Sequence, residues 1–175
     1  MQRESLARGF RITTKVGALT LEHEAPGVAL LRVERAATGE TMVPVFEALE
    51  PVIARHGSIV VFIDGEALES YDTDCRRRWT SWLSEHRGKV VVHVLVRSRL
   101  LQMGVNLVNP LIGGFIVSHS ERSSFEAELR KARVRSRDHS AASRTGVSAI
   151  GSEGAGSLGF ARRALRRSIH PASST

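Results

Sequence analysis

The sequence predicts an α/β fold, a mixed and mainly parallel sheet flanked by helices. Two hydrophobic patterns alternate along residues 1–135: short apolar runs typical of strands, and three-to-four-residue spacing typical of amphipathic helices. Strands that alternate with helices favour parallel pairing through right-handed crossovers. After residue 135, Ser, Ala, Gly and Arg dominate, with too few apolar residues to offset the entropy of ordering the backbone. We therefore expect one domain over residues 1–135 and a disordered tail over residues 136–175.

The first strands are expected to form the antiparallel edge of the sheet. Residues 10–24 alternate apolar and polar side chains around a turn at Gly17, a pattern that predicts a hairpin. Pro26-Gly27 predicts the next turn, and residues 28–33 a third strand. A helix over residues 38–55 follows, which Pro51 should kink.

Strands and helices then alternate. The apolar runs 58–63 and 90–96 predict central strands covered on both faces. Between them Asp72 is the expected N-cap of a helix. Residues 98–114 predict a third helix, 115–117 a short strand, and the residues after Ser120 or Ser123 a last helix. The side chains expected to face the core from the second and last helices are Cys75, Trp79, Trp82, Leu83, Phe125, Leu129 and Ala132.

The net charge of +7 suggests an anionic partner, but its distribution weakens that interpretation. Residues 1–135 hold 19 basic and 16 acidic residues, whereas residues 136–175 hold six basic and two acidic residues. Over half of the surplus therefore lies in the tail. Nucleic-acid binding is expected only weakly, through the tail arginines.

The rest of the composition argues against several classes of protein. The single cysteine, Cys75, excludes an internal disulfide framework and a four-cysteine zinc site, and it fits a reducing compartment. No run reaches the roughly 18 apolar residues of a spanning helix, and no signal-like stretch opens the chain. No motif for a cofactor, a metal or catalysis stands out. We expect a cytoplasmic protein that is not an enzyme.

Two further side chains, those of His93 and Cys75, suggest a functional role that we do not favour. His93 alternates with valines in a buried strand, which is more typical of a core histidine than of a metal ligand. Cys75 shares the helical face of Trp79, and acidic neighbours oppose its ionisation, so we expect an inert thiol.

The most informative stretch is the acidic segment between residues 60 and 78. Carboxylates cluster after a buried strand, where function tends to lie in open α/β sheets. A metal or acid–base site is one interpretation. Solvated carboxylates and favourable charge at a helix N-terminus are the interpretation we favour, because no histidine or second acidic motif completes a site. The carboxylates are those of Asp64, Glu66, Glu69, Asp72 and Asp74.

This stretch resembles the STAS domain of bacterial anti-sigma factor antagonists and sulfate-transporter tails. That family has a strand ending in Asp, a loop, and then Asp-Ser-Ser-Gly at the start of a helix. Here Asp64 follows VVFI, and Asp72-Thr73-Asp74-Cys75 comes eight residues later. The resemblance covers about residues 27–132 and places Thr73 where the family carries its phosphorylated serine. Asp74 and Cys75 depart from the family's Ser-Gly.

The segments YDTDCRRRWTSWLSEHR, VHVLVRSRLLQMGVNLVN and SERSSFEAEL also resemble bacterial proteins described as STAS/SEC14-like. The resemblance implies a regulatory or scaffold module with a protein partner and a phosphorylation candidate at Thr73. Alternatives are a small-ligand or lipid-binding module using the apolar helix 100–112, and weak nucleic-acid binding through the tail. A homodimer is a further possibility. The expected partner-binding residues are Asp64, Glu66, Asp72, Thr73, Asp74, Arg76 and Arg77.

Overall fold

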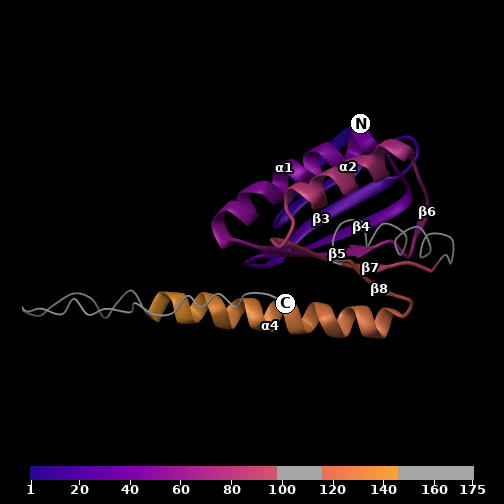
Figure 1. The fold of residues 1–175 in the computed structure, drawn as a ribbon. Helices are drawn as coiled ribbons and strands as arrows, with labels where there is room; N and C mark the ends of the chain where they lie inside the picture. The colour runs from indigo at the N-terminus through magenta and orange to yellow at the C-terminus, as the bar shows by residue number, and fades with distance from the viewer. Residues whose placement is uncertain (98–115, 146–175) are drawn as a thin grey trace, which may run out of the picture.

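The computed structural model describes residues 1–97 and 116–145, the last seven by backbone alone. Its strands form one mixed sheet with helices on both faces, as predicted (Figure 1). The helices α1 and α2 lie side by side on one face, and α4 lies on the other. The helices are α1 (Gly39–His56), α2 (Thr73–Glu85) and α4 (Arg122–Thr145). The strands are β1 (Gln2–Leu6), β2 (Gly9–Thr13), β3 (Ala18–Ala25), β4 (Val28–Ala37), β5 (Ile59–Asp64), β6 (Leu68–Tyr71), β7 (Val90–Leu95) and β8 (Ile116–His119).

The strand order is β1-β2-β3-β4-β5-β7-β8, with β6 paired to the far end of β4. The pairings from β1 to β4 are antiparallel, and those of β4 with β5, β5 with β7, and β7 with β8 are parallel. The predicted hairpin therefore forms the antiparallel side. The runs predicted as central strands are direct parallel neighbours, Ile59 opposite Val90 and Ile63 opposite Val94.

Alternation along the strands builds a core on each face of the sheet. On β4, Ala29, Leu31 and Val33 face the larger core under α1 and α2, whereas Val28 and Leu30 face α4. Phe125 and Leu129 of α4 complete the smaller core, as the helical spacing predicted, and Ala132 packs against it. Each strand thus sends successive side chains to opposite layers.

The helix α1 runs through both Pro44 and Pro51 to His56. At its start the Thr38 backbone N–H donates to Thr41 Oγ1 at 3.3 Å. At its end Gly57 adopts a left-handed conformation (φ 76°) and its N–H donates to the Ile53 carbonyl at 2.8 Å. Gly57 is therefore the left-handed C-cap of α1.

Several predicted boundaries differ from the structure. The strands β1 and β6 were not predicted, because QRESL and LESY are short and mostly polar. The helix α4 begins at Arg122, so neither Ser120 nor Ser123 is its N-cap; Arg122 is instead held by ion pairs from another element. The helix also continues ten residues beyond residue 135, since extending an existing helix costs much less than starting one. The predicted helix over residues 98–114 and residues 146–175 of the tail lie outside the described residues.

Candidate functional site

Asp72 caps two helices at once. Its Oδ1 accepts a hydrogen bond from the Cys75 backbone N–H at 2.6 Å, which is the predicted N-cap of α2. The same oxygen accepts from the Gly39 N–H at 3.1 Å, at the start of α1. The Asp72 backbone N–H also donates to the Ala37 carbonyl at 3.1 Å. One carboxylate therefore fixes the N-termini of α1 and α2 beside each other.

Thr73 is the first residue of α2, and it is exposed as the register predicted. Next to it, Asp74 accepts a hydrogen bond from Arg78 Nε at 2.7 Å and pairs with Arg77. The hydrogen bond from Arg78, followed by that from Arg77, lowers the pKa of Asp74. A side chain at Gly39 would overlap the Asp74 carboxylate, so the two helix starts are closely packed.

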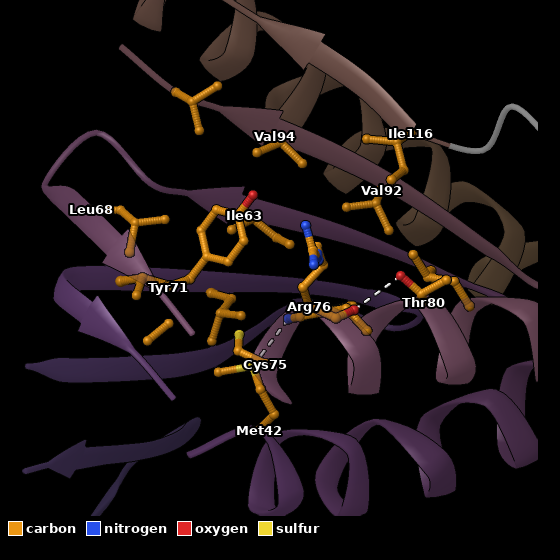
Figure 2. Close-up of a pocket in the computed structure, with 16 residues that line it drawn as sticks. Met42, Ile63, Leu68, Tyr71, Cys75, Arg76, Thr80, Val92, Val94 and Ile116 are labelled. Carbon is orange, nitrogen blue, oxygen red and sulfur yellow. Dashed lines mark hydrogen bonds between the residues drawn. The ribbon is translucent and has the colours of Figure 1, made fainter. Parts of the chain in front are cut away.

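The arginines of α2 differ in their surroundings. The Arg77 side chain is 77% exposed and reaches Asp74. The Arg76 guanidinium forms no ion pair or side-chain hydrogen bond with any residue of the described ranges, 1–97 and 116–138. It rises from α2 towards the sheet, beside Tyr71 (Figure 2).

The side chains on the inward face of α2 pack against other parts of the protein and hold the helix in place. Cys75 is buried, and burial, followed by the charges of Asp72 and Asp74, raises the pKa of its thiol to about 12. The prediction of an inert thiol is thus supported. Trp82 is 5% exposed and its indole N–H donates to Glu50 Oε1 at 2.7 Å, while the Trp79 indole contacts Met42 Sδ at 3.0 Å.

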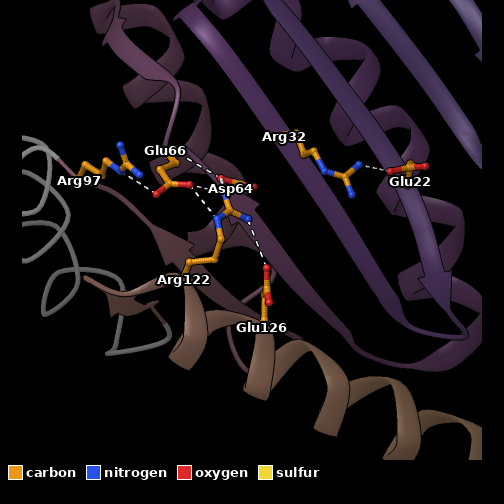
Figure 3. A network of polar contacts seen from close by, with 7 residues as sticks. All are labelled: Glu22, Arg32, Asp64, Glu66, Arg97, Arg122 and Glu126. Carbon is orange, nitrogen blue, oxygen red and sulfur yellow. Dashed lines mark hydrogen bonds and ion pairs between the residues drawn. The ribbon is translucent and has the colours of Figure 1, made fainter.

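Asp64 and Glu66 lie on the α4 side of the sheet, apart from the α2 start. Arg122 Nη2 donates to Asp64 Oδ2 at 3.0 Å, and Arg122 Nε donates to Glu66 Oε2 at 2.8 Å (Figure 3). Arg97 Nε donates to Glu66 Oε1 at 2.6 Å. The hydrogen bond from Arg122, followed by that from Arg97, lowers the pKa of Glu66. The hydrogen bonds to Glu66 and then to Asp64 raise the pKa of Arg122.

The two carboxylate side chains are only 13% and 19% exposed, for Asp64 and Glu66 respectively. They therefore connect the end of β5 to the start of α4. Sequence reasoning placed them with Thr73 because they are close along the chain, and it did not find Arg122. Nothing local could have indicated this partner, which follows Asp64 by 58 residues.

His93 has the satisfied environment expected of a core histidine. Its Nδ1 lies 3.0 Å from His119 Nε2, and its ring stacks on Phe62 at 4.6 Å. His119 Nδ1 lies 3.1 Å from Ser124 Oγ. Burial lowers the pKa of both histidines, and the charge of His119 lowers that of His93 further. The sequence analysis missed His119, which is 6% exposed at the end of β8.

Among the described residues, no group of three or more His, Cys, Asp or Glu side chains could hold a metal ion. Within the same residues, no helix has the length and apolar character needed to cross a membrane.

Comparison with known proteins identifies the fold of this chain. No family model matches the chain, and no curated protein matches it. An uncharacterized DUF3478-family protein with a SpoIIAA-like fold from Shewanella loihica PV-4 matches with a TM-score of 0.50 at 15% identity, over 67% of this chain and 98% of that one. An anti-sigma factor antagonist from Mycobacterium paratuberculosis matches with a TM-score of 0.47 at 14% identity, over 68% of this chain and 99% of that one. The chain has a SpoIIAA-like fold, the STAS-type fold that the sequence predicted.

Proposed function

We propose that the chain is a non-catalytic regulatory module that binds a protein partner through the start of α2. The centre of this surface is Thr73, with Asp72, Asp74, Arg76 and Arg77 around it; we call these five residues the α2 entry surface. Asp64 and Glu66, the other residues predicted for partner binding, pair with Arg122 on the α4 side of the sheet and lie outside the α2 entry surface.

The observation that carries this proposal is the double cap by Asp72. Because one carboxylate binds the N–H groups of both Cys75 and Gly39, the exposed Thr73 follows a backbone that is fixed at two points. A surface that is ordered before binding loses less conformational entropy when a partner docks. Charged side chains of both signs on that surface suit a partner of complementary charge.

Phosphorylation of Thr73 would change this surface strongly. A phosphate adds about −1.5 to −2 charges at neutral pH, next to the carboxylates of Asp72 and Asp74. Arg76 and Arg77 follow Thr73 by three and four residues, the spacing at which side chains on a helix meet. A phosphate would therefore compete with Asp74 for Arg77 and attract Arg76, which has no ionic partner among the described residues. We expect the partner-facing charge pattern to change while the fold stays intact.

A quantitative capture experiment tests this proposal. The full chain and its Thr73→Glu and Thr73→Ala variants are immobilised, and proteins from a bacterial lysate that the unmodified chain retains are quantified. The matched control is Thr13→Glu, which adds the same charge at an exposed position of β2. We expect a specific partner to be retained by the unmodified chain and Thr13→Glu, and its retention to change with Thr73→Glu.

Two results would contradict the proposal. Equal retention of every protein by Thr73→Glu and the unmodified chain would show that this surface has no partner role. Unfolding of Thr73→Glu, measured by circular dichroism, would show that Thr73 is not the exposed residue on which the proposal depends.

The alternatives kept from the sequence are a ligand wall formed by the helix 100–112, nucleic-acid binding through the tail, and homodimerisation. The helix 100–112 lies outside the described residues, and so does most of the tail. The protein-partner proposal is favoured because two hydrogen bonds of Asp72 fix the α2 entry surface.

A further inference from the structure

A small apolar cavity lies between the sheet and α2. Its volume is about 150 Å³. The walls include aliphatic side chains of the central strands, among them Ile63, Val92 and Val94 (Figure 2). Trp79 of α2 also lines the cavity. A cavity of this volume with mostly apolar walls is comparable in size to one that holds a benzene molecule. The cavity therefore suits an apolar group of about six carbons.

Among the described residues that line this apolar space, Arg76 is the one with a charged side chain. Arg76 leaves α2 beside Tyr71 and extends towards the strands that form the cavity wall (Figure 2). Its guanidinium has no ionic partner among the residues that the structure describes, whereas its neighbours Arg77 and Arg78 both pair with Asp74. A guanidinium binds carboxylates through paired, charge-assisted hydrogen bonds.

We propose that this cavity binds a small carboxylate with an apolar body of about six carbons. The carboxylate would pair with Arg76, and the apolar body would fill the space between Val92, Val94 and Trp79. The acidic side chains nearest in sequence do not neutralise Arg76: Asp72 accepts from two backbone N–H groups, and Asp74 pairs with the other two arginines. Charge and shape thus select an anion with an apolar end over a neutral or cationic molecule.

Titration followed by ¹H–¹⁵N NMR tests this binding with the full chain. The probes are hexanoate and benzoate, which separate aliphatic from aromatic bodies, and hexylamine, which keeps the chain length but reverses the charge. We expect either carboxylate to shift the signals of cavity residues, such as Val92 and the Trp79 indole. Hexylamine should shift them at least tenfold more weakly.

Two variants separate the polar and apolar contacts. Arg76→Gln should weaken carboxylate binding by about tenfold, the effect of losing one charge-assisted contact. Arg78→Gln, the matched control, should change affinity less than twofold, because Arg78 pairs with Asp74 and does not line the cavity. Ala37→Leu, which enlarges a wall residue, should block binding of every probe.

The proposal is overturned if neither carboxylate shifts the cavity signals, or if hexylamine binds as strongly as hexanoate. Equal affinities of Arg76→Gln and Arg78→Gln would likewise overturn it. Should Ala37→Leu fail to fold, the comparison of the two arginine variants still decides the outcome.

Discussion

Replacing Asp72 by Ala should destabilise the protein more than the loss of an ordinary helix cap. An N-cap carboxylate contributes typically about 1 kcal/mol, here through the 2.6 Å bond from the Cys75 N–H. The bond from the Gly39 N–H at 3.1 Å adds a contact to a charged acceptor, for which we take the lower end of its range, about 1.5 kcal/mol. Partial solvation reduces the sum, and we expect a loss of about 2 kcal/mol in the free energy of unfolding.

Urea denaturation monitored by tryptophan fluorescence measures this loss. At roughly 4 °C per kcal/mol for a domain of this size, the melting temperature should fall by about 8 °C. Asp72→Asn keeps one acceptor oxygen and ranks equally as an N-cap, so it should lose less than about 1 kcal/mol. Glu69→Ala, which removes an exposed carboxylate of β6, should stay within about 0.5 kcal/mol.

Amide hydrogen exchange distinguishes the double cap from a single one. In Asp72→Ala, protection should fall at Cys75 and also at Gly39, which precedes Asp72 by 33 residues. Loss of protection at Cys75 alone would refute the role in α1. A free energy of unfolding equal to that of Glu69→Ala would refute the reasoning as a whole.

Three other outcomes are expected. Because burial lowers the pKa of His93 and His119 below the usual 6.5, the unfolded chain takes up protons first, and the free energy of unfolding should fall as pH drops below about 6.5. Replacing both histidines by Gln should make the free energy of unfolding, measured by urea titration between pH 7.5 and 5.5, depend less on pH. An unchanged pH dependence would show that these two histidines do not cause it. Phe125→Ala should lower the free energy of unfolding by about 3–5 kcal/mol, because it leaves a cavity in the core under α4. Val134, on the same helix, is 58% exposed, and Val134→Ala should lower it by less than about 0.5 kcal/mol. Similar losses for the two variants in urea denaturation would show that Phe125 of α4 does not pack against the sheet. Deleting residues 146–175 should leave the melting temperature nearly unchanged, since that segment has few apolar residues, and a drop of many degrees in calorimetry would count against a disordered tail.

Features that depend on neighbours along the chain were predictable. The apolar runs of β5 and β7 identified the central strands, and helical spacing identified the buried faces of α2 and α4. Asp72 was recognisable as a cap because its acceptor reaches the N–H group of a residue only three positions later. The exposure of Thr73 followed from the same register. These predictions required only the periods of strands and helices and the geometry of a helix end.

Tertiary structure decided which distant groups meet. The second bond of Asp72 needs Gly39 beside it, and the pairing of Asp64 needs Arg122 from the helix that follows β8. Asp64 and Thr73 are close in the sequence, but they lie on opposite sides of the sheet. Successive side chains of β5 face opposite layers, and that of Asp64 faces the α4 side. The cavity beside Arg76 likewise exists only where β4, β5 and β7 are neighbours under α2. Such contacts depend on strand order and on the face that each side chain occupies, and a local pattern does not contain that information.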